Sequence, residues 1–330
     1  MGVAEVGVVA IGRNEGARLI ACLRSALRDC RDVVYVDSGS SDGSAEAARA
    51  LGAEVVELDL AIPFTAARAR NAGFRALLAR APGLDFVQFV DGDCELREGW
   101  IAAAAEALRA DPGLAVVCGR RRERFPEATL WNRLCDLEWD TPVGPALYCG
   151  GDSLMRAEAV SAVGGWRDGL IAGEEPELCV RLRAAGWGVE RLDLEMTWHD
   201  AAMTRFSQWW RRSVRAGHAY AEGAWLHGRA PERHWVRETI RALAWGALMP
   251  AAAVLGALLW SPWALALLLA WPAQAARLAL REDGGREAWL SGVLSVLGKL
   301  AEARGILRFV AGRAFGGGPK LIEYKAPSQA

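Results

Sequence analysis

The sequence predicts an α/β fold with a mostly parallel sheet, followed by a helical C-terminal region that associates with a membrane. In the first two thirds of the chain, short apolar runs rich in β-branched residues alternate with amphipathic stretches of about ten to fifteen residues, a pattern typical of βαβ units. Between Arg241 and Arg277 there is no charged residue, and this span exceeds the roughly 20 residues that one membrane helix needs.

The expected elements follow one another along the chain. Apolar or alternating runs predict strands at residues 6–11, 33–36, 53–58, 86–90, 114–118, 187–192 and 195–198. Apolar residues at helical spacing predict helices at residues 16–27, 65–78, 98–110 and 131–139, with an Ala-rich helix after the Ser/Gly/Asp loop at 37–44.

Composition excludes several classes of function. About half of the residues are hydrophobic, which is enough for a substantial core, and the formal net charge of −1 gives no support for nucleic-acid binding. Seven cysteines occur without a Cys-x-x-Cys pair. This predicts buried thiols in a reducing compartment, with neither a disulfide framework nor a zinc site.

The predicted strand at 86–90 ends in Asp91-Gly92-Asp93. In open α/β sheets, ligands bind beyond the carboxyl ends of the strands, and two carboxylates one residue apart can converge on Mg²⁺ or Mn²⁺. Magnesium typically takes one or two carboxylates and completes its shell with substrate phosphates. The sequence therefore indicates a metal-bridged diphosphate site, with an ordinary Asp-Gly turn as the alternative.

Glycine-rich phosphate loops are missing from the first βα turn. A dinucleotide-binding fold would carry Gly-x-Gly-x-x-Gly after Ile11, and a P-loop would carry Gly-x4-Gly-Lys-Ser/Thr. The sequence there is Gly12-Arg13-Asn14-Glu15. Bound phosphates would therefore need a metal, which Asp91 and Asp93 offer.

Four motifs together resemble the family 2 glycosyltransferases of the GT-A fold. They are residues 9–15 (Val-Ala-Ile-Gly-Arg-Asn-Glu), 36–44 (Val-Asp-Ser-Gly-Ser-Ser-Asp-Gly-Ser), 70–73 (Arg-Asn-Ala-Gly) and 91–93 (Asp-Gly-Asp). Each lies beyond a predicted strand or at the start of a helix, and the resemblance covers roughly residues 3–215.

The resemblance implies roles for the donor side of the site. Residues Ile11, Asn14 and Glu15 would edge the nucleotide-base pocket, and Asp37 would accept a hydrogen bond from the base, unless it only caps its loop. Arg70 would lie near the diphosphate, unless it faces solvent from its helix.

The resemblance also implies a metal site. Asp93 would bind Mg²⁺ or Mn²⁺ directly, Asp91 and Gly92 would contact the ribose or a metal-bound water, and the cation would stabilise the departing diphosphate. His199 follows a predicted strand where several GT-A enzymes place a third metal ligand, and its alternative role lies in the acceptor site.

On the acceptor side, residues 148–156 resemble the family's Gly-Gly-Asn strand, with Asp152 in place of Asn. The role of Asp152 is therefore open between acceptor binding and structure. Residues 163–166 fit a Gly-Gly-aromatic turn, which places Trp166 at the acceptor pocket. Glu175 occupies the position of the family's catalytic Asp and is the expected general base, with Glu174 in reserve. Otherwise both would stabilise a helix N-terminus.

Two further segments have less specific expectations. The basic run Arg120-Arg121-Arg122-Glu123-Arg124 is expected to be a solvated loop, with contact to an anionic acceptor as the alternative. The helix at 131–139 could wall the acceptor pocket.

The uncharged span predicts two short helices, at 243–260 and 263–276, that turn at Ser261-Pro262. Basic residues precede and follow it, namely Arg233, Arg237, Arg241, Arg277, Arg281 and Arg286, so the positive-inside rule places both flanks in the cytoplasm. A hairpin satisfies this rule and a single span does not. The alternative is a buried hairpin of a soluble domain. Residues 289–315 show apolar spacing typical of a helix that lies on a membrane or packs on the catalytic domain.

The predicted organisation is a GT-A catalytic domain at 1–215, a basic and aromatic linker helix at 216–241, a transmembrane or re-entrant hairpin at 242–280, and an amphipathic helix with a flexible tail at 281–330. We expect a bacterial inner-membrane glycosyltransferase of cell-envelope polysaccharide synthesis, with its catalytic domain in the cytoplasm. It would move a sugar from a nucleoside-diphosphate donor to a hydroxyl on a lipid-linked or glycan acceptor, with inversion.

Two alternatives are a non-catalytic nucleotide-sugar-binding subunit and a sugar-phosphate nucleotidyltransferase. The first would be favoured by a missing carboxylate, and all three key positions are filled. The second would show an N-terminal Gly-rich loop with a basic residue.

Overall fold

The computed structural model describes residues 6–282 and 284–316, in two compact units that divide between Thr204 and Arg205. The expected boundary after residue 215 falls inside one continuous helix, α8 (Phe206–His227). Dividing a helix between two units would break its hydrogen-bond ladder, so the division lies in the irregular segment before it. The expected tail beyond residue 316 lies outside the described residues.

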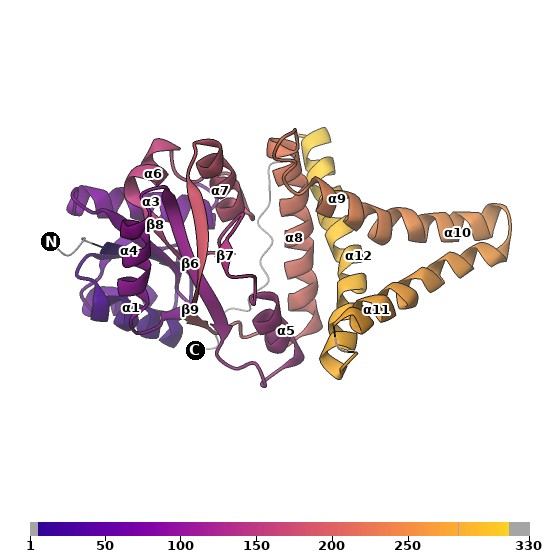
Figure 1. Cartoon of the computed structure of the whole chain (residues 1–330), viewed down its shortest axis with the longest axis horizontal. Coiled ribbons are helices and arrows are strands. Elements are labelled where there is room, and N and C mark those ends of the chain that lie inside the picture. Colours follow the sequence, from indigo (N-terminus) through magenta and orange to yellow (C-terminus); the bar gives the residue numbers. More distant parts are fainter. Residues whose placement is uncertain (1–5, 283, 317–330) are drawn as a thin grey trace. The chain divides into compact units, whose positions relative to one another are not determined.

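The first unit contains a mixed sheet whose N-terminal half is parallel (Figure 1). Its four strands are β1 (Val6–Gly12), β2 (Val33–Asp37), β3 (Glu54–Glu57) and β4 (Phe86–Asp91). Strand β1 pairs in parallel with β2 and β4, with Ile11 opposite Asp91 and Gly12 opposite Asp37. The carboxyl ends of three strands therefore meet at one edge of the sheet, as the sequence predicted.

The other half of the sheet is largely antiparallel. It contains β5 (Cys94–Leu96), β6 (Leu114–Glu123), β7 (Gly144–Pro145), β8 (Ser153–Arg156) and β9 (Gly188–His199). The strand order is β3-β2-β1-β4-β8-β6-β9-β5, and β7 pairs with β9.

Two expectations for this half were wrong. The basic run from Arg120 is not a solvated loop, because β6 continues through Glu123 and pairs with β9. The two strands expected at 187–198 are one strand, β9, whose register against β6 shifts beside Gly119. A Cβ on Gly119 would lie 2.6 Å from the Leu194 carbonyl oxygen, so β9 bulges there and its alternating pattern is interrupted.

Within its described residues the first unit also contains seven helices: α1 (Ala17–Asp29), α2 (Ser44–Ala50), α3 (Ala66–Arg80), α4 (Trp100–Ala110), α5 (Leu130–Glu138), α6 (Ala157–Ala162) and α7 (Glu174–Ala184). The core between these helices and the sheet includes the fully buried apolar side chains of β1, β2 and β4. The seven cysteines are buried and free, as the sequence predicted.

Helix α3 approaches the sheet closely at Gly73. A Cβ on Gly73 would lie 2.4 Å from Val9 Cγ1 and 2.8 Å from Val36 Cγ2. Only glycine allows this approach, which fixes the position of Arg70 one turn earlier on the same helix.

Gly73→Val is expected to lower the free energy of unfolding by about 3 kcal/mol, because overpacking forces the helix away from the sheet. Urea unfolding followed by circular dichroism measures this change. Arg75→Val is the matched control, since Arg75 is exposed on the same helix and loses only helix propensity, less than about 0.7 kcal/mol. Equal effects in the two variants would contradict close packing at Gly73.

All regular secondary structure in the described residues of the second unit is helical (Figure 1). It contains α8, α9 (Val236–Leu243), the π-helix η1 (Ala244–Leu248), α10 (Met249–Leu259), the 3₁₀ helix η2 (Pro262–Leu269), α11 (Ala270–Arg281) and α12 (Arg286–Ala314). Two continuous helical segments, Val236–Leu259 and Pro262–Arg281, are long and apolar enough to cross a membrane by length and composition. They turn at Ser261, as the sequence predicted.

The apolar face expected for the helix at 289–315 is not the face that packs. Trp289, Val293, Leu307 and Val310 are exposed, whereas small residues of α12 are buried. A Cβ on Gly305 would lie 2.0 Å from the Val214 carbonyl oxygen of α8. Small side chains let the two helix backbones approach here, and larger side chains such as Ile306 and Phe309 are buried as well.

Candidate active site

Asp37 lies at the end of β2 and holds the loop that follows. Its buried carboxylate accepts hydrogen bonds from the Tyr35 hydroxyl at 2.9 Å and from the backbone N–H groups of Gly39 and Ser40 at 2.9 and 2.8 Å. Asp37 therefore caps its loop, the structural role that the sequence left open, and it does so at the edge where the donor is expected.

Asn14 links the loop after β1 to the loop after β2. Its N–H donates to Ser40 Oγ at 2.9 Å, and its side-chain oxygen accepts from the Ser41 N–H at 2.8 Å. Asn14 adopts a left-handed conformation with φ 55°. Nearby, Glu15 is buried and pairs with Arg18 at 2.7 Å. Hydrogen bonds thus join the two loops into one surface beside Ile11.

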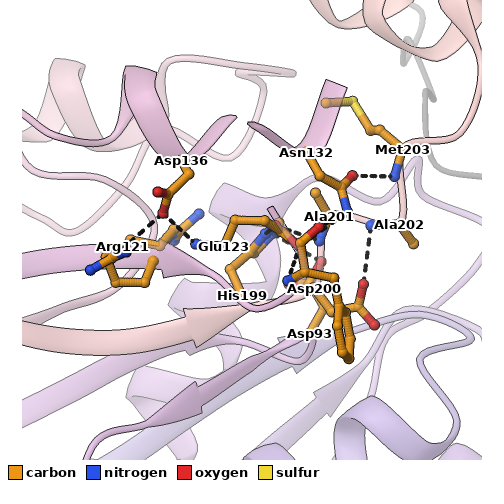
Figure 2. Close-up of polar contacts among 12 residues, drawn as sticks. Asp93, Arg121, Glu123, Asn132, Asp136, His199, Asp200, Ala201, Ala202 and Met203 are labelled. Carbon is orange, nitrogen blue, oxygen red and sulfur yellow. Dashed lines mark hydrogen bonds and ion pairs between the residues drawn. The ribbon is translucent and has the colours of Figure 1, made fainter. Parts of the chain in front are cut away.

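Asp93 and His199 converge at the neighbouring position of this edge (Figure 2). The His199 Nε2 atom lies 3.2 Å from Asp93 Oδ2, and both side chains are buried. On the other side of the ring, Nδ1 lies 3.5 Å from Glu123 Oε2. Nε2 here pairs with Asp93, and a proton on Nδ1 directed at Glu123 would let Nε2 and Asp93 share a metal ion, the arrangement of a metal-ligating histidine held by a carboxylate.

Sequence reasoning missed Glu123, which organises the polar contacts in Figure 2. Its carboxylate accepts from the N–H groups of Phe125 and Ala201, at 3.1 and 3.0 Å, and from Asn132 Nδ2 at 3.2 Å. Glu123 is completely buried inside a run of arginines. No local pattern indicates this burial, because it follows from the pairing of β6 with β9.

Asp91 does not join Asp93 and His199 in one cluster. Its Oδ1 lies 2.7 Å from Arg70 Nη2, and its Oδ2 lies 3.5 Å from Arg121 Nη2. Convergence of Asp91 and Asp93 on one cation therefore stays a prediction, because Asp91 here contacts the two arginines. Gly92 separates them, and its N–H donates to the Ile11 carbonyl at 2.8 Å.

Arg70 connects the two halves of the site. It is 2% exposed, so it does not lie on a solvated helix face. Its Nη1 atom lies 2.6 Å from Glu175 Oε1 and 3.2 Å from Glu174 Oε1, while Nη2 pairs with Asp91. Burial by itself lowers the pKa of Arg70, but these carboxylates raise it above its ordinary value. The positive charge of Arg70 therefore lies between Asp91, at the edge where the donor is expected, and the expected base, Glu175.

Glu175 lies in the first turn of α7, next to Glu174. Burial raises the pKa of its carboxyl to about 7, against the opposing effect of Arg70. A carboxyl that titrates near neutral pH is suited to act as a general base. The position at a helix N-terminus, which the sequence offered as the alternative, is observed as well.

Asp152 and Trp166 lie behind the site, and neither is open to an acceptor. Asp152 is fully buried, and it accepts from the Asp91 N–H at 3.0 Å and from Thr197 Oγ1 at 2.8 Å. Its Oδ2 also lies 2.9 Å from Arg121 Nη2. Trp166 is buried edge-on against Phe89, with ring centroids 4.5 Å apart. Both side chains have structural contacts here, and a place for them at the acceptor pocket stays a prediction.

The donor atoms beside Asp93 fit a divalent cation. The ligand atoms of Asp93, Cys94 and His199 lie within 4.8 Å of one another. Burial and nearby carboxylates raise the pKa of the Cys94 thiol well above its ordinary value, which opposes formation of the thiolate that binds a metal. One carboxylate and one imidazole remain, which leaves coordination positions for phosphate oxygens.

The carboxylate and imidazole pair at the edge of the mixed α/β sheet could hold a metal ion, and comparison with known proteins supports a glycosyltransferase. Residues 8–148 match the sequence model of the family described as glycosyl transferase family 2. Residues 8–148 are therefore similar to family 2 glycosyltransferases, and the fold is the GT-A fold. Glu174, Glu175 and His199 lie beyond the matched residues, and only the tertiary structure brings them to this domain's site.

The mannosyltransferase PcManGT from Pyrobaculum calidifontis, described in complex with GDP-Man and Mn²⁺, is similar in structure to the chain. The similarity has a TM-score of 0.62 and 22% sequence identity, and covers 92% of this chain and 87% of that one. Glucosyl-3-phosphoglycerate synthase from Mycobacterium tuberculosis matches with a TM-score of 0.48 and 20% identity, over 66% of this chain and 78% of that one. A search of curated proteins gives no match.

Proposed function

We propose that the protein transfers a sugar from a nucleoside-diphosphate donor to a hydroxyl acceptor by a single displacement with inversion. The observation that carries this proposal is the pair of ion pairs that Arg70 makes with Asp91 and Glu175. Arg70 joins Asp91, at the end of β4, to Glu175, whose carboxyl titrates near neutral pH. The donor edge and the general base are thereby held by the two terminal nitrogens of one buried guanidinium group.

Glu175 would take the proton from the acceptor hydroxyl. The hydroxyl oxygen then attacks the anomeric carbon, the bond from this carbon to the diphosphate oxygen breaks, and the nucleoside diphosphate leaves. Asp93 and His199 would hold the divalent cation, which when bound neutralises charge on the diphosphate as a Lewis acid. The imidazole ligand supports Mn²⁺ over Mg²⁺, because magnesium prefers oxygen ligands. The Mn²⁺ of the Pyrobaculum complex supports the same choice.

The nucleotide would lie along the cross-linked loops after β1 and β2. Ile11, Asn14 and Glu15 would edge the base, and the Asp37 Oδ1 atom, which accepts from Tyr35, has a second lone pair for the base. Arg121, on β6, is partly buried beside Asp91. It would add positive charge where a diphosphate is expected.

The second unit would hold the enzyme at the cytoplasmic face of the bacterial inner membrane, where the acceptor would be lipid-linked or a growing surface glycan. Two apolar helical segments support this proposal. So do the exposed large side chains of the hairpin, among them Trp260, which is 94% exposed. Apolar side chains left in water on this scale are typical of membrane contact.

A donor screen tests the proposal. The full chain in detergent is incubated with GDP-, UDP- and other nucleoside-diphosphate sugars, with and without Mn²⁺, and thermal unfolding and donor consumption are measured. A bound donor raises the unfolding temperature with the logarithm of its concentration. We expect stabilisation by one donor class and only with the metal. Stabilisation by none of the donors would refute the proposal.

The rate of transfer is expected to rise about tenfold per pH unit below pH 7 and to level off above it, because only ionised Glu175 accepts a proton and its pKa is about 7. Initial rates at subsaturating donor, measured from pH 5.5 to pH 8.5 with fixed Mn²⁺, give this profile. A rate that does not change between pH 5.5 and pH 7 would contradict the assignment of Glu175.

A further inference from the structure

The second unit contains an open groove that the proposed transfer reaction does not use. It lies between η1 and α12, has a volume of about 430 Å³, and is almost entirely apolar. Its lining residues are Gly246, Ala247, Leu300, Ala303, Arg304, Leu307, Arg308 and Ala311. The volume falls within the range of about 300–1,000 Å³ that is typical of sites for small ligands.

The groove exists because small residues and a π-helix occur together. A Cβ on Gly246 would lie 1.8 Å from the Lys299 carbonyl oxygen, so η1 and α12 touch through their backbones at this point. Ala247, Ala303 and Ala311 leave space along the contact, and Leu300 and Leu307 form apolar walls. Single-turn π-helices often accompany functional sites.

Two arginines border this apolar groove. Arg304 and Arg308 are exposed and lie four residues apart, so they project from the same face of α12. Within residues 6–282 and 284–316, neither has a hydrogen bond or an ion pair. Other cations of the helix are engaged: Lys299 pairs with Glu302 at 2.6 Å, and Arg313 lies over the Trp225 ring at 5.0 Å.

We propose that this groove binds one anionic phospholipid, with its phosphate on Arg304 and Arg308 and an acyl chain along the apolar floor. Charge complementarity supports an anion, and the apolar lining supports a lipid over free phosphate. Gly246 and Ala247 belong to the candidate membrane segment Val236–Leu259, so the groove would open at membrane depth. Basic pockets beside membrane helices bind anionic headgroups in this way. The inference rests on the membrane association proposed above.

Native mass spectrometry of the full chain in detergent tests this site, with phosphatidylglycerol and phosphatidylcholine as probes. We expect retention of one phosphatidylglycerol and weaker retention of phosphatidylcholine. Neutralising both arginines (R304Q/R308Q) should weaken phosphatidylglycerol binding about 30-fold. This factor corresponds to about 1 kcal/mol of binding free energy for each arginine, with about 1.4 kcal/mol for each factor of ten. The control R277Q/R281Q removes two exposed arginines at the same spacing on α11, outside the groove, and should retain the lipid.

A second pair of variants tests the apolar half. Ala311→Phe fills the groove and keeps both arginines, and we expect it to lose phosphatidylglycerol. Val310→Phe changes the adjacent exposed residue outside the groove lining and should keep it. Equal retention of the two lipids, no effect of R304Q/R308Q or Ala311→Phe, or equal binding of inorganic phosphate alone would overturn the proposal.

Vesicle sedimentation separates failure of this site from failure of the proposed function. If the chain binds phosphatidylcholine vesicles but gains nothing from phosphatidylglycerol, the groove is wrong and membrane association stands. If it sediments with neither, both the groove and the membrane association fail. Sugar transfer to a soluble acceptor by R304Q/R308Q is expected to equal that of the natural protein, because these arginines lie outside the catalytic unit.

Discussion

Glu175→Gln is expected to reduce the turnover of sugar transfer by about 10² to 10⁴, the range that one general base contributes. Glutamine keeps the size of the side chain but cannot accept the proton of the acceptor hydroxyl. The pairing of Arg70 with Asp91 and Glu174 remains, so we expect the protein to stay folded and to bind its donor. Single-turnover rates at saturating donor, together with thermal unfolding, measure this effect.

Glu174→Gln is the matched control for this variant. It removes a neighbouring carboxylate of the same helix turn, which also contacts Arg70, and we expect a loss of less than about tenfold, because the base itself remains. The reverse order, with a full rate in Glu175→Gln and a large loss in Glu174→Gln, would move the base to Glu174.

Asp93→Asn is expected to lower metal-dependent transfer by about 10³, since Lewis-acid stabilisation contributes several kcal/mol and each 1.4 kcal/mol is a factor of ten. The amide removes the negative charge that faces His199 Nε2 at 3.2 Å and leaves one neutral imidazole to hold the cation. Titration of initial rates with Mn²⁺ should show that much higher metal concentrations are needed.

Cys94→Ala provides the control for this site. Cys94 belongs to the same cluster of candidate ligand atoms, but its thiol is not expected to bind the metal, so its Mn²⁺ dependence should match that of the natural protein. An unchanged Mn²⁺ titration in Asp93→Asn would show that the cation is held elsewhere, with Asp91 as the next candidate.

The parallel half of the fold was predictable because its signals are local. The apolar runs at β1, β2 and β4, and the loops that follow them, are each visible within about ten residues of sequence. Parallel pairing then places Ile11, Asp37 and Asp91 at one edge. The uncharged hairpin was predictable for the same reason, since length and composition alone indicate two apolar helices.

The half of the sheet from β5 to β9 was not predictable, because its signals depend on partners distant in the chain. Glu123 appears in the sequence as part of a charged run, and it is buried only because β6 pairs with β9, about 75 residues later. In α12, small residues lie where the backbone of α8 approaches closely, and Trp289 and Leu307 are exposed. Helical spacing by itself favoured the opposite face.

The sequence by itself determined the donor edge: strands ending in Asp37 and Asp91, and Asp93 one residue further on. Only the tertiary structure decided which partners Asp91 and Asp93 contact. Asp91 pairs with Arg70 and Arg121, whereas Asp93 pairs with His199, whose other ring nitrogen contacts Glu123. The physical reason is that a buried charge needs an opposite charge or a hydrogen bond, and the fold, by bringing distant strands together, determines which partner each one meets.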